Sequence, residues 1–229
     1  MDFFGGIGRF AGDVWNDHVA PNLPGAEVPE VPIVEPYGPA GSVDGSGLGQ
    51  AQQSPPVVPI QEKAVSDTLS YAEGTWDEAS NSPDYTMRFG DRKGEGSLDV
   101  TKPHPLDVRG SIYGTEGVAS NASGAFQFLD PTWKEMNDGQ NAIMSPANQD
   151  RAVGRLIKGE GYDYNSPFAE QAPKLAGRWA SIPNEEGVSN YGQPVHHSAE
   201  ELGDFHKGRL EDLTAKDRMR VYRERLINK

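Results

Sequence analysis

The sequence contains no cysteine, and this absence removes two kinds of structure at once. Without thiols the chain can form neither a disulfide framework nor a thiolate metal site. Its five histidines show no recognisable ligand spacing, so we expect no metal centre and no other cofactor. Long apolar runs are also missing, since no stretch approaches the roughly 20 residues of a membrane-spanning helix.

Positive charge is scarce as well, and the formal net charge is -13. This balance argues against general binding to nucleic acids, which requires a basic surface to displace counterions. It also argues against adhesion to anionic lipid. The N-terminus, MDFFGGIGRF, has an acid at position 2 and glycines within its apolar run, so no signal peptide is expected. If the protein acts outside the cell that made it, another route must carry it there.

Two segments precede the part of the chain that reads as a globular domain. Residues 1–20 place apolar side chains at helical spacing beside three aspartates, which predicts an amphipathic docking segment. Docking onto another protein is favoured over a membrane role, because membrane-surface helices carry lysine and arginine. Packing of this segment on its own domain is the remaining alternative. Residues 21–61 are rich in proline and glycine and predict an extended linker.

Residues 62–197 have the composition and hydrophobic pattern of a folded domain of the α+β class. Glu62–Glu73 carries a helical apolar stripe, and Gly74 behind it suits the left-handed end of a helix. Residues 75–122 predict short strands and loops. GAFQF then predicts a strand that leads into a helix with Asp130 as N-cap.

Four more helices are expected after that one. SPANQDRA starts a helix capped by Ser145, and PFAEQAPKLAGRWASIP predicts a helix that continues to Pro183. Residues 198–229 form a C-terminal extension, where capping patterns at Ser198 and at Thr214 predict two helices. The basic residues of this extension indicate a solvated helical face, a contact with an acidic partner or a contact with acidic segments of the chain itself.

Glu73 is oddly placed, because the negative end of the helix dipole disfavours a carboxylate there. A helix that ends in glutamate and is followed by a small sheet and further helices resembles the lysozyme-like fold. The motifs LSYAEGT, KPHP, SNASGAFQFL, SPANQDRA, RWASIP and NYGQ occur here in that order. Together they resemble the lambda-phage type of endolysin, a lytic transglycosylase of the lysozyme superfamily, over about residues 66–197.

The resemblance implies a substrate and a catalytic residue. The substrate is the β-1,4 bond between N-acetylmuramic acid and N-acetylglucosamine in peptidoglycan glycan strands, and Glu73 matches the family's single catalytic glutamate. It would act as general acid and then as base, a role for which a raised pKa is useful. Further residues are expected to bind substrate: Gln127, Ser120, Ser123, Trp76, Phe126, Tyr191 and Gln193.

Alternatives remain open for both the mechanism and the biological role. If Asp77, Glu78 or Asp84 lay about 6.5–9.5 Å from Glu73, it could activate water and make the enzyme an inverting hydrolase. The N-terminal segment and the basic C-terminus favour an enzyme docked to tail or core proteins of a phage virion, where it would open the cell wall during DNA entry. A free endolysin and a catalytically silent virion protein are the alternatives.

Overall fold

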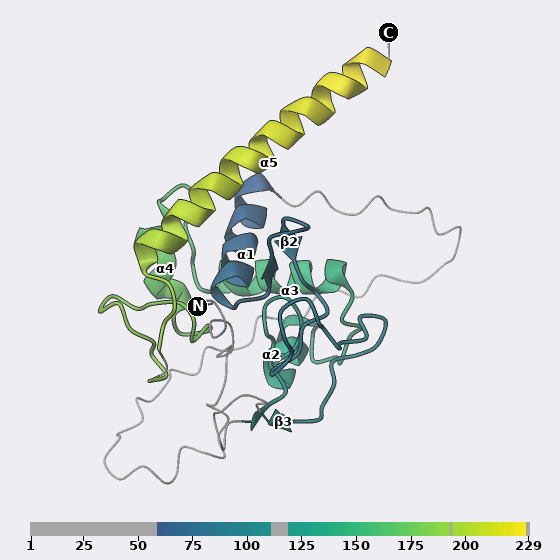
Figure 1. Ribbon diagram of the computed structural model, residues 1–229, viewed down its shortest axis with the longest axis vertical. Coiled ribbons are helices and arrows are strands. Elements are labelled where there is room, and N and C mark those ends of the chain that lie inside the picture. Colours follow the sequence, from purple (N-terminus) through teal and green to yellow (C-terminus); the bar gives the residue numbers. More distant parts are fainter. Residues whose placement is uncertain (1–58, 111–118, 193, 228–229) are drawn as a thin grey trace, which may run out of the picture. The chain divides into compact units, whose positions relative to one another are not determined.

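The computed structural model describes residues 59–110, 119–192 and 194–227, which all belong to one compact unit. The predicted docking segment and nearly all of the predicted linker lie outside these residues, as do 111–118 and Gln193. The elements follow one another as α1 (Ile60–Ala72), β1 (Trp76–Asp77), β2 (Ser82–Pro83), β3 (Arg109–Gly110), β4 (Ala119–Ser120), α2 (Asp130–Met136), α3 (Pro146–Gly159), α4 (Phe168–Leu175) and α5 (Ala199–Ile227) (Figure 1). This order confirms the predicted fold class, a helical domain with small antiparallel strand pairs after its first helix.

The strands form two short antiparallel ladders. In the first, Trp76 of β1 lies opposite Pro83 of β2, and in the second, Arg109 of β3 lies opposite Ser120 of β4. Each strand is only two residues long, so side chains rather than ladder hydrogen bonds must hold these loops in place.

Helix α1 ends in a Schellman motif. Gly74 has a positive φ of 71°, its N–H donates to the Tyr71 carbonyl, and the Thr75 N–H donates to the Ser70 carbonyl. This is the double hydrogen bond that closes a helix through a left-handed residue. Glu73 is therefore the C-cap of α1, as the glycine behind it predicted.

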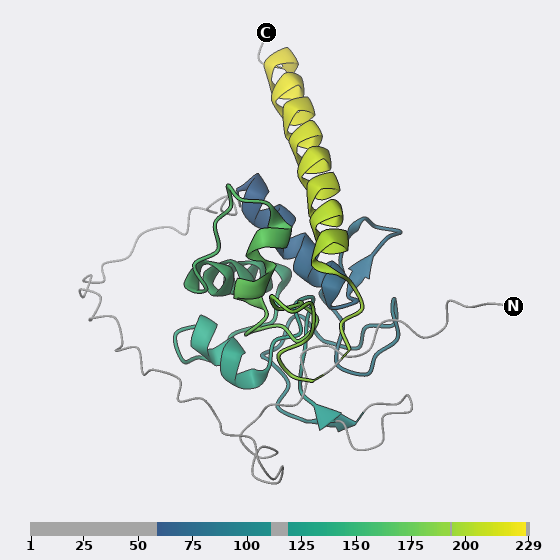
Figure 2. The same ribbon diagram turned by 90° about the vertical axis from the view of Figure 1, so that its left-hand side faces the viewer.

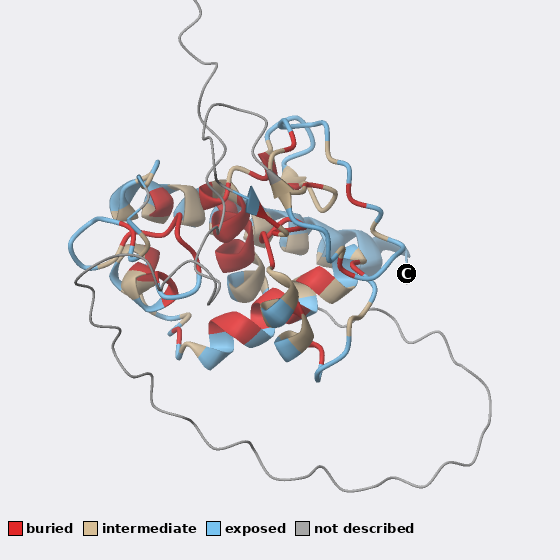
Figure 3. Ribbon diagram, turned by 90° about the horizontal axis from the view of Figure 1, so that it is seen from below, coloured by how far each residue is buried: buried red, intermediate tan, exposed pale blue. Residues whose placement is uncertain are grey.

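The hydrophobic core lies where the helices meet, and Figure 3 shows the buried residues concentrated there. Leu69 comes from α1, Trp133 from α2, Ile157 from α3 and Phe168 from α4, and each is at most 1% exposed. Four short helices thus share one core, which fixes the end of α1 relative to the loops around it.

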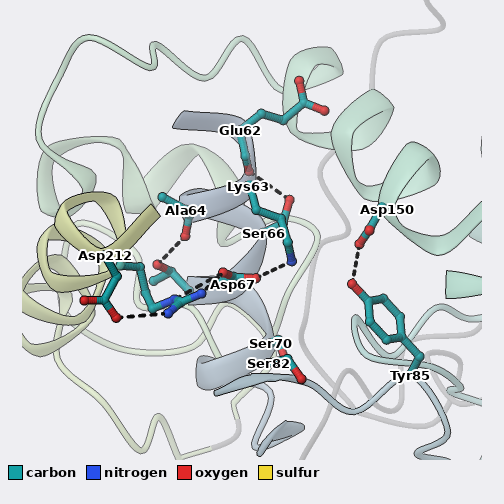
Figure 4. Close-up of polar contacts among 12 residues, drawn as sticks. Glu62, Lys63, Ala64, Ser66, Asp67, Ser70, Ser82, Tyr85, Asp150 and Asp212 are labelled. Carbon is teal, nitrogen blue, oxygen red and sulfur yellow. Dashed lines mark hydrogen bonds and ion pairs between the residues drawn. The ribbon is translucent and has the colours of Figure 1, made fainter. Parts of the chain in front are cut away.

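Helix α5 packs its N-terminal half on α1 and α4, and its C-terminal half extends away from the other described elements (Figures 1 and 2). Arg209 of α5 donates from Nη2 to Oδ2 of Asp67 on α1 at 2.8 Å, and Lys63 Nζ contacts Oδ1 of Asp67 at 2.5 Å. Figure 4 shows Asp67 with its polar neighbours. Both Asp67 and Arg209 are buried, so this ion pair joins the two helices inside the fold.

The predicted helix boundaries are partly wrong. The helix expected to continue to Pro183 ends at Leu175, and Trp179 is buried beyond its end. Asp130 is the first residue of α2 rather than its cap, which is Leu129, and the Asp130 carboxylate pairs with Lys134 at 2.8 Å. The C-terminal extension is one helix, since the Thr214 hydroxyl donates to the Leu210 carbonyl within α5 instead of capping a new one.

The predicted strand at GAFQF is also wrong. Residues 124–127 form a turn closed by two backbone hydrogen bonds, at 3.0 and 2.9 Å, between Ser123 and Phe128. Gly124 and Gln127 both have positive φ, of 83° and 48°, which a strand does not permit. We call residues 123–128 the Gln127 turn.

Candidate active site

The Glu73 carboxyl group is buried at the C-terminus of α1, and the residue is 4% exposed. Its Oε1 accepts a hydrogen bond of 2.5 Å from the hydroxyl of Ser181, which follows α4. This hydrogen bond joins the end of α1 to a segment far along the chain and orients the carboxyl group.

Two further hydrogen bonds place the Gln127 turn beside the end of α1. The Thr75 hydroxyl, two residues after Glu73, donates to the Ala125 carbonyl at 2.5 Å. Trp179, two residues before Ser181, donates from Nε1 to the Phe126 carbonyl at 3.2 Å. The three segments that carry Glu73, Gln127 and Ser181 are therefore bonded to one another pairwise.

Gln127 itself has an unusual conformation for a residue with a side chain. Its φ of 48° lies in the left-handed region, and it is 6% exposed. Its side-chain amide donates to the Gly124 carbonyl at 2.8 Å, so the amide closes the turn from inside. A left-handed non-glycine residue costs about 1–2 kcal/mol, which the contacts around the turn must offset.

Those contacts come from two distant motifs. Gln149 of α3 is fully buried, and its Oε1 accepts from the Ala125 N–H at 2.9 Å while its Nε2 donates to the Met144 carbonyl at 2.7 Å. The ring Nε2 of His104, in KPHP, lies 2.8 Å from the Phe128 carbonyl and must donate to it. Burial lowers the pKa of His104, so its ring stays neutral and donates through one nitrogen.

The predicted serines use their hydroxyls within their own segment. Ser120 of β4 accepts from the Ala122 N–H at 2.9 Å, and the Ser123 hydroxyl donates to the Asn121 carbonyl at 2.9 Å. Both are buried, as is Phe126, whose ring packs edge-on against Tyr85 and Phe128. These three residues shape the loop that carries Gln127, and their contact with substrate stays a prediction.

The structure does not place Trp76 as a platform for sugar stacking. Trp76 is 3% exposed, with the guanidinium carbon of Arg209 4.7 Å from its ring centroid and Phe205 against its edge. The ring lies beneath α5, because the C-terminal extension packs over the residues that follow Glu73. The extension was predicted as a separate segment, and a contact of its basic residues with acids of the chain itself was one of the alternatives; the Arg209–Asp67 pair is such a contact.

Tyr191 is the remaining predicted site residue among those described. Its hydroxyl donates to the Gly177 carbonyl. Burial raises the pKa of Tyr191, so the phenol keeps its proton and remains a donor. The bond ties the NYGQ segment to the residues that lead to Ser181, whereas Gln193 lies outside the described residues.

The three acids considered as partners for Glu73 are engaged elsewhere. Asp77 accepts from the backbone N–H groups of Ala79 and Ser80, and Glu78 is exposed and lies 2.5 Å from Lys93 Nζ. Asp84 accepts from the backbone and hydroxyl of Thr86. Within the residues described here, no group of three or more histidines and acids could hold a metal, and no helix could cross a membrane.

Ser181 is a site residue that sequence reasoning did not identify. It lies in RWASIP, one of the six quoted motifs, but 108 positions separate it from Glu73. Nothing local marks a serine as the partner of so distant a carboxyl group. Its place in RWASIP, one of the motifs of the endolysin resemblance, is the one signal in the sequence that marks Ser181 as a candidate.

Ser181→Ala is expected to slow the reaction that the resemblance assigns to Glu73 about tenfold, because the carboxyl group loses the hydroxyl that donates to it. The initial rate of glycan cleavage measures the change. Ser66→Ala is the control, because it removes another buried hydroxyl, which donates to the Glu62 carbonyl near the start of α1. An unchanged rate in Ser181→Ala, or an equal loss in Ser66→Ala, would contradict this role.

Comparisons with known proteins identify the family of this chain and structures with a similar fold. The protein-family comparison matches residues 63–210 to the family described as Endolysin. Among solved structures, bacteriophage lambda lysozyme complexed with a chitohexasaccharide is 24% identical, with a TM-score of 0.54, and covers 66% of this chain and 95% of its own. A second structure, lysozyme from bacteriophage lambda, is 21% identical with a TM-score of 0.48, over 68% of this chain and 95% of its own. A comparison with curated protein sequences gave no match.

Proposed function

The chain belongs to the Endolysin family of peptidoglycan-degrading enzymes, and on that basis we propose that it cleaves the MurNAc–GlcNAc β-1,4 bond by lytic transglycosylation with Glu73 as acid and base. The observation that carries the proposal is the placement of Glu73. It is a single buried carboxyl group at a helix end, hydrogen-bonded to Ser181 and tied through Thr75 to the Gln127 turn.

In this mechanism the protonated Glu73 donates its proton to the glycosidic oxygen as that bond breaks and positive charge develops on the muramic acid ring. The resulting carboxylate then takes the proton of the C6 hydroxyl, whose oxygen forms a bond to C1 and closes a 1,6-anhydro ring. No water is consumed, and Glu73 returns to its acid form. Gln127 closes the turn bonded to this helix end with its own amide, and its role here is to keep that turn in place beside Glu73.

The surroundings of Glu73 favour this route over an inverting hydrolase. An inverting enzyme needs a second carboxylate that holds water. Asp77 and Asp84 instead accept hydrogen bonds from residues of their own loops, and Glu78 forms an ion pair with Lys93.

Mass spectrometry of digested, purified peptidoglycan tests the reaction type. We expect products that end in 1,6-anhydro-N-acetylmuramic acid. Products with reducing N-acetylmuramic acid ends would overturn transglycosylation while leaving peptidoglycan cleavage intact. No product from the parent chain would favour a silent structural role.

We further propose that the enzyme is carried in a phage virion and opens the cell wall during DNA entry. The support is the composition of the chain outside the catalytic fold: an apolar, acidic segment at residues 1–20 and a proline-rich segment at 21–61. Proteomics of purified virions is expected to find the protein. Its absence there would make a free endolysin, released late in infection, the better assignment.

A further inference from the structure

The C-terminal half of α5 carries an apolar stripe that no described residue covers. Met219, Tyr222 and Leu226 are 53%, 59% and 56% exposed, and Ala215 is exposed beside them. Ile227, the last described residue, is 82% exposed and lies beside this row rather than in it. In Figures 1 and 2 this half of the helix extends away from the other described elements. Single exposed apolar residues are ordinary, but a row along one helix face indicates a contact.

The spacing of the stripe identifies the kind of contact. Its members, residues 215, 219, 222 and 226, are separated by four, three and four positions, which is the d–a–d–a order of a heptad repeat. At 100° per residue they fall within an arc of about 60°. A broad apolar face is typical of helices that lie on a globular core or on lipid, whereas a strict a/d stripe is typical of a coiled-coil seam.

The charges beside the stripe select the occupant. With residue 219 at position a, the e and g positions are Lys216, Arg223, Arg218 and Arg225, all cationic. The acids Asp217 and Glu224 lie at position f on the opposite side, where both pair with Arg220. Both flanks of the seam are therefore positive, and no acid on this helix neutralises them from a flanking position.

This pattern disfavours a second copy of the chain. In a parallel pair each g position faces an e position, and in an antiparallel pair like positions face each other. Either arrangement would bring cation against cation along the whole seam. An acidic helix would instead place a carboxylate beside each of these cations.

We propose that residues 215–227 are a docking surface for an acidic amphipathic helix of a partner protein, which pairs with α5 as a coiled coil. The seam spans about two heptads, so the contact is short and depends on its flanking charges. The inference rests on the proposed virion role in one respect, namely that the partner would be a virion protein. Binding and virion proteomics are separate measurements, so failure of one does not imply failure of the other.

The binding test uses the full-length chain and a synthetic helical peptide with leucine at positions a and d and glutamate at e and g. The control peptide has the same composition, with its leucines moved off the seam. We expect the heptad peptide to bind at least about tenfold more tightly than the control in isothermal titration calorimetry. Equal binding of the two peptides would mean only non-specific charge attraction and would overturn the proposal, as would no binding.

Variants locate the binding on the stripe. Tyr222→Ser combined with Leu226→Ser is expected to weaken binding about tenfold or more, because it removes half of the seam. Arg223→Gln should weaken binding, whereas Arg220→Gln, which removes one cation from the opposite face, should leave it unchanged. Equal losses in these two arginine variants would contradict the coiled-coil geometry.

Two other occupants have distinct signatures. Sedimentation velocity would detect a second copy as self-association of the parent that the Tyr222→Ser, Leu226→Ser variant loses. Co-sedimentation with vesicles of phosphatidylglycerol would detect binding to anionic lipid, as vesicle binding by the parent that the Tyr222→Ser, Leu226→Ser variant loses. Either result, without preference for the heptad peptide, would overturn the proposal.

Discussion

Glu73→Gln is expected to lower the rate of peptidoglycan cleavage by about 10³-fold, within the range that a positioned general acid supplies. The glutamine oxygen can still accept the hydrogen bond from Ser181, so the variant should fold like the parent. Only the exchangeable proton is lost, and the same group is needed to protonate the leaving oxygen and to deprotonate the C6 hydroxyl. The measurement is the initial rate of muropeptide release from purified peptidoglycan.

Glu78→Gln is the matched control for this experiment. It removes the same charge from an exposed glutamate five residues away, whose side chain pairs with Lys93. We expect its rate to stay within about twofold of the parent, because an exposed ion pair contributes little. If Glu73→Gln kept more than a tenth of the parent rate, another group would have to supply the proton.

Arg209→Met is expected to have the largest effect on folding, lowering the free energy of unfolding by about 3 kcal/mol. The substitution preserves most of the side chain's bulk over Trp76 but leaves Asp67 fully buried with only Lys63 as a charged partner. A buried charge that loses a partner is costly because its lost hydration is no longer offset. Urea denaturation followed by circular dichroism measures the change.

Arg220→Met tests whether burial is the cause. Arg220 also lies on α5 and also makes two ion pairs, but it is exposed, and we expect a loss below about 1 kcal/mol. Adding Asp67→Asn to Arg209→Met should restore part of the stability, because the unpaired charge is then gone. Equal losses in the two single arginine variants, or no recovery in the double variant, would show that burial of the ion pair is not what stabilises the fold.

Local signals in the sequence predicted the parts of the fold that local chemistry determines. Gly74 ends α1 with a positive φ, Ser145 accepts from the Asn148 N–H at the start of α3, and Ser198 and Glu201 form a capping box at α5. Each of these depends on residues within a few positions of one another. The Endolysin resemblance was confirmed for the same chain region.

The Gln127 turn shows why the rest could not be predicted. GAFQF has the composition of a strand, and nothing within it requires a left-handed residue at Gln127. The conformation is imposed by Gln149, Trp179 and His104, which reach the turn from three separate segments. Each of these residues lies in one of the motifs that carry the resemblance. Only the folded structure shows that all three hydrogen-bond to the same turn.

The uninterrupted course of α5 has a mechanical consequence. One helix carries both Arg209, bonded to the helix that ends in Glu73, and the stripe of Met219, Tyr222 and Leu226. Because a helix is stiff and advances 1.5 Å and 100° per residue, the direction in which the stripe faces relative to Arg209, and so to α1, is set by the number of residues between Arg209 and the stripe. One inserted alanine would turn the stripe by about 100° relative to the enzyme. A partner bound to the stripe would therefore hold the domain in one orientation, and the length of the helix between Arg209 and the stripe would determine that orientation.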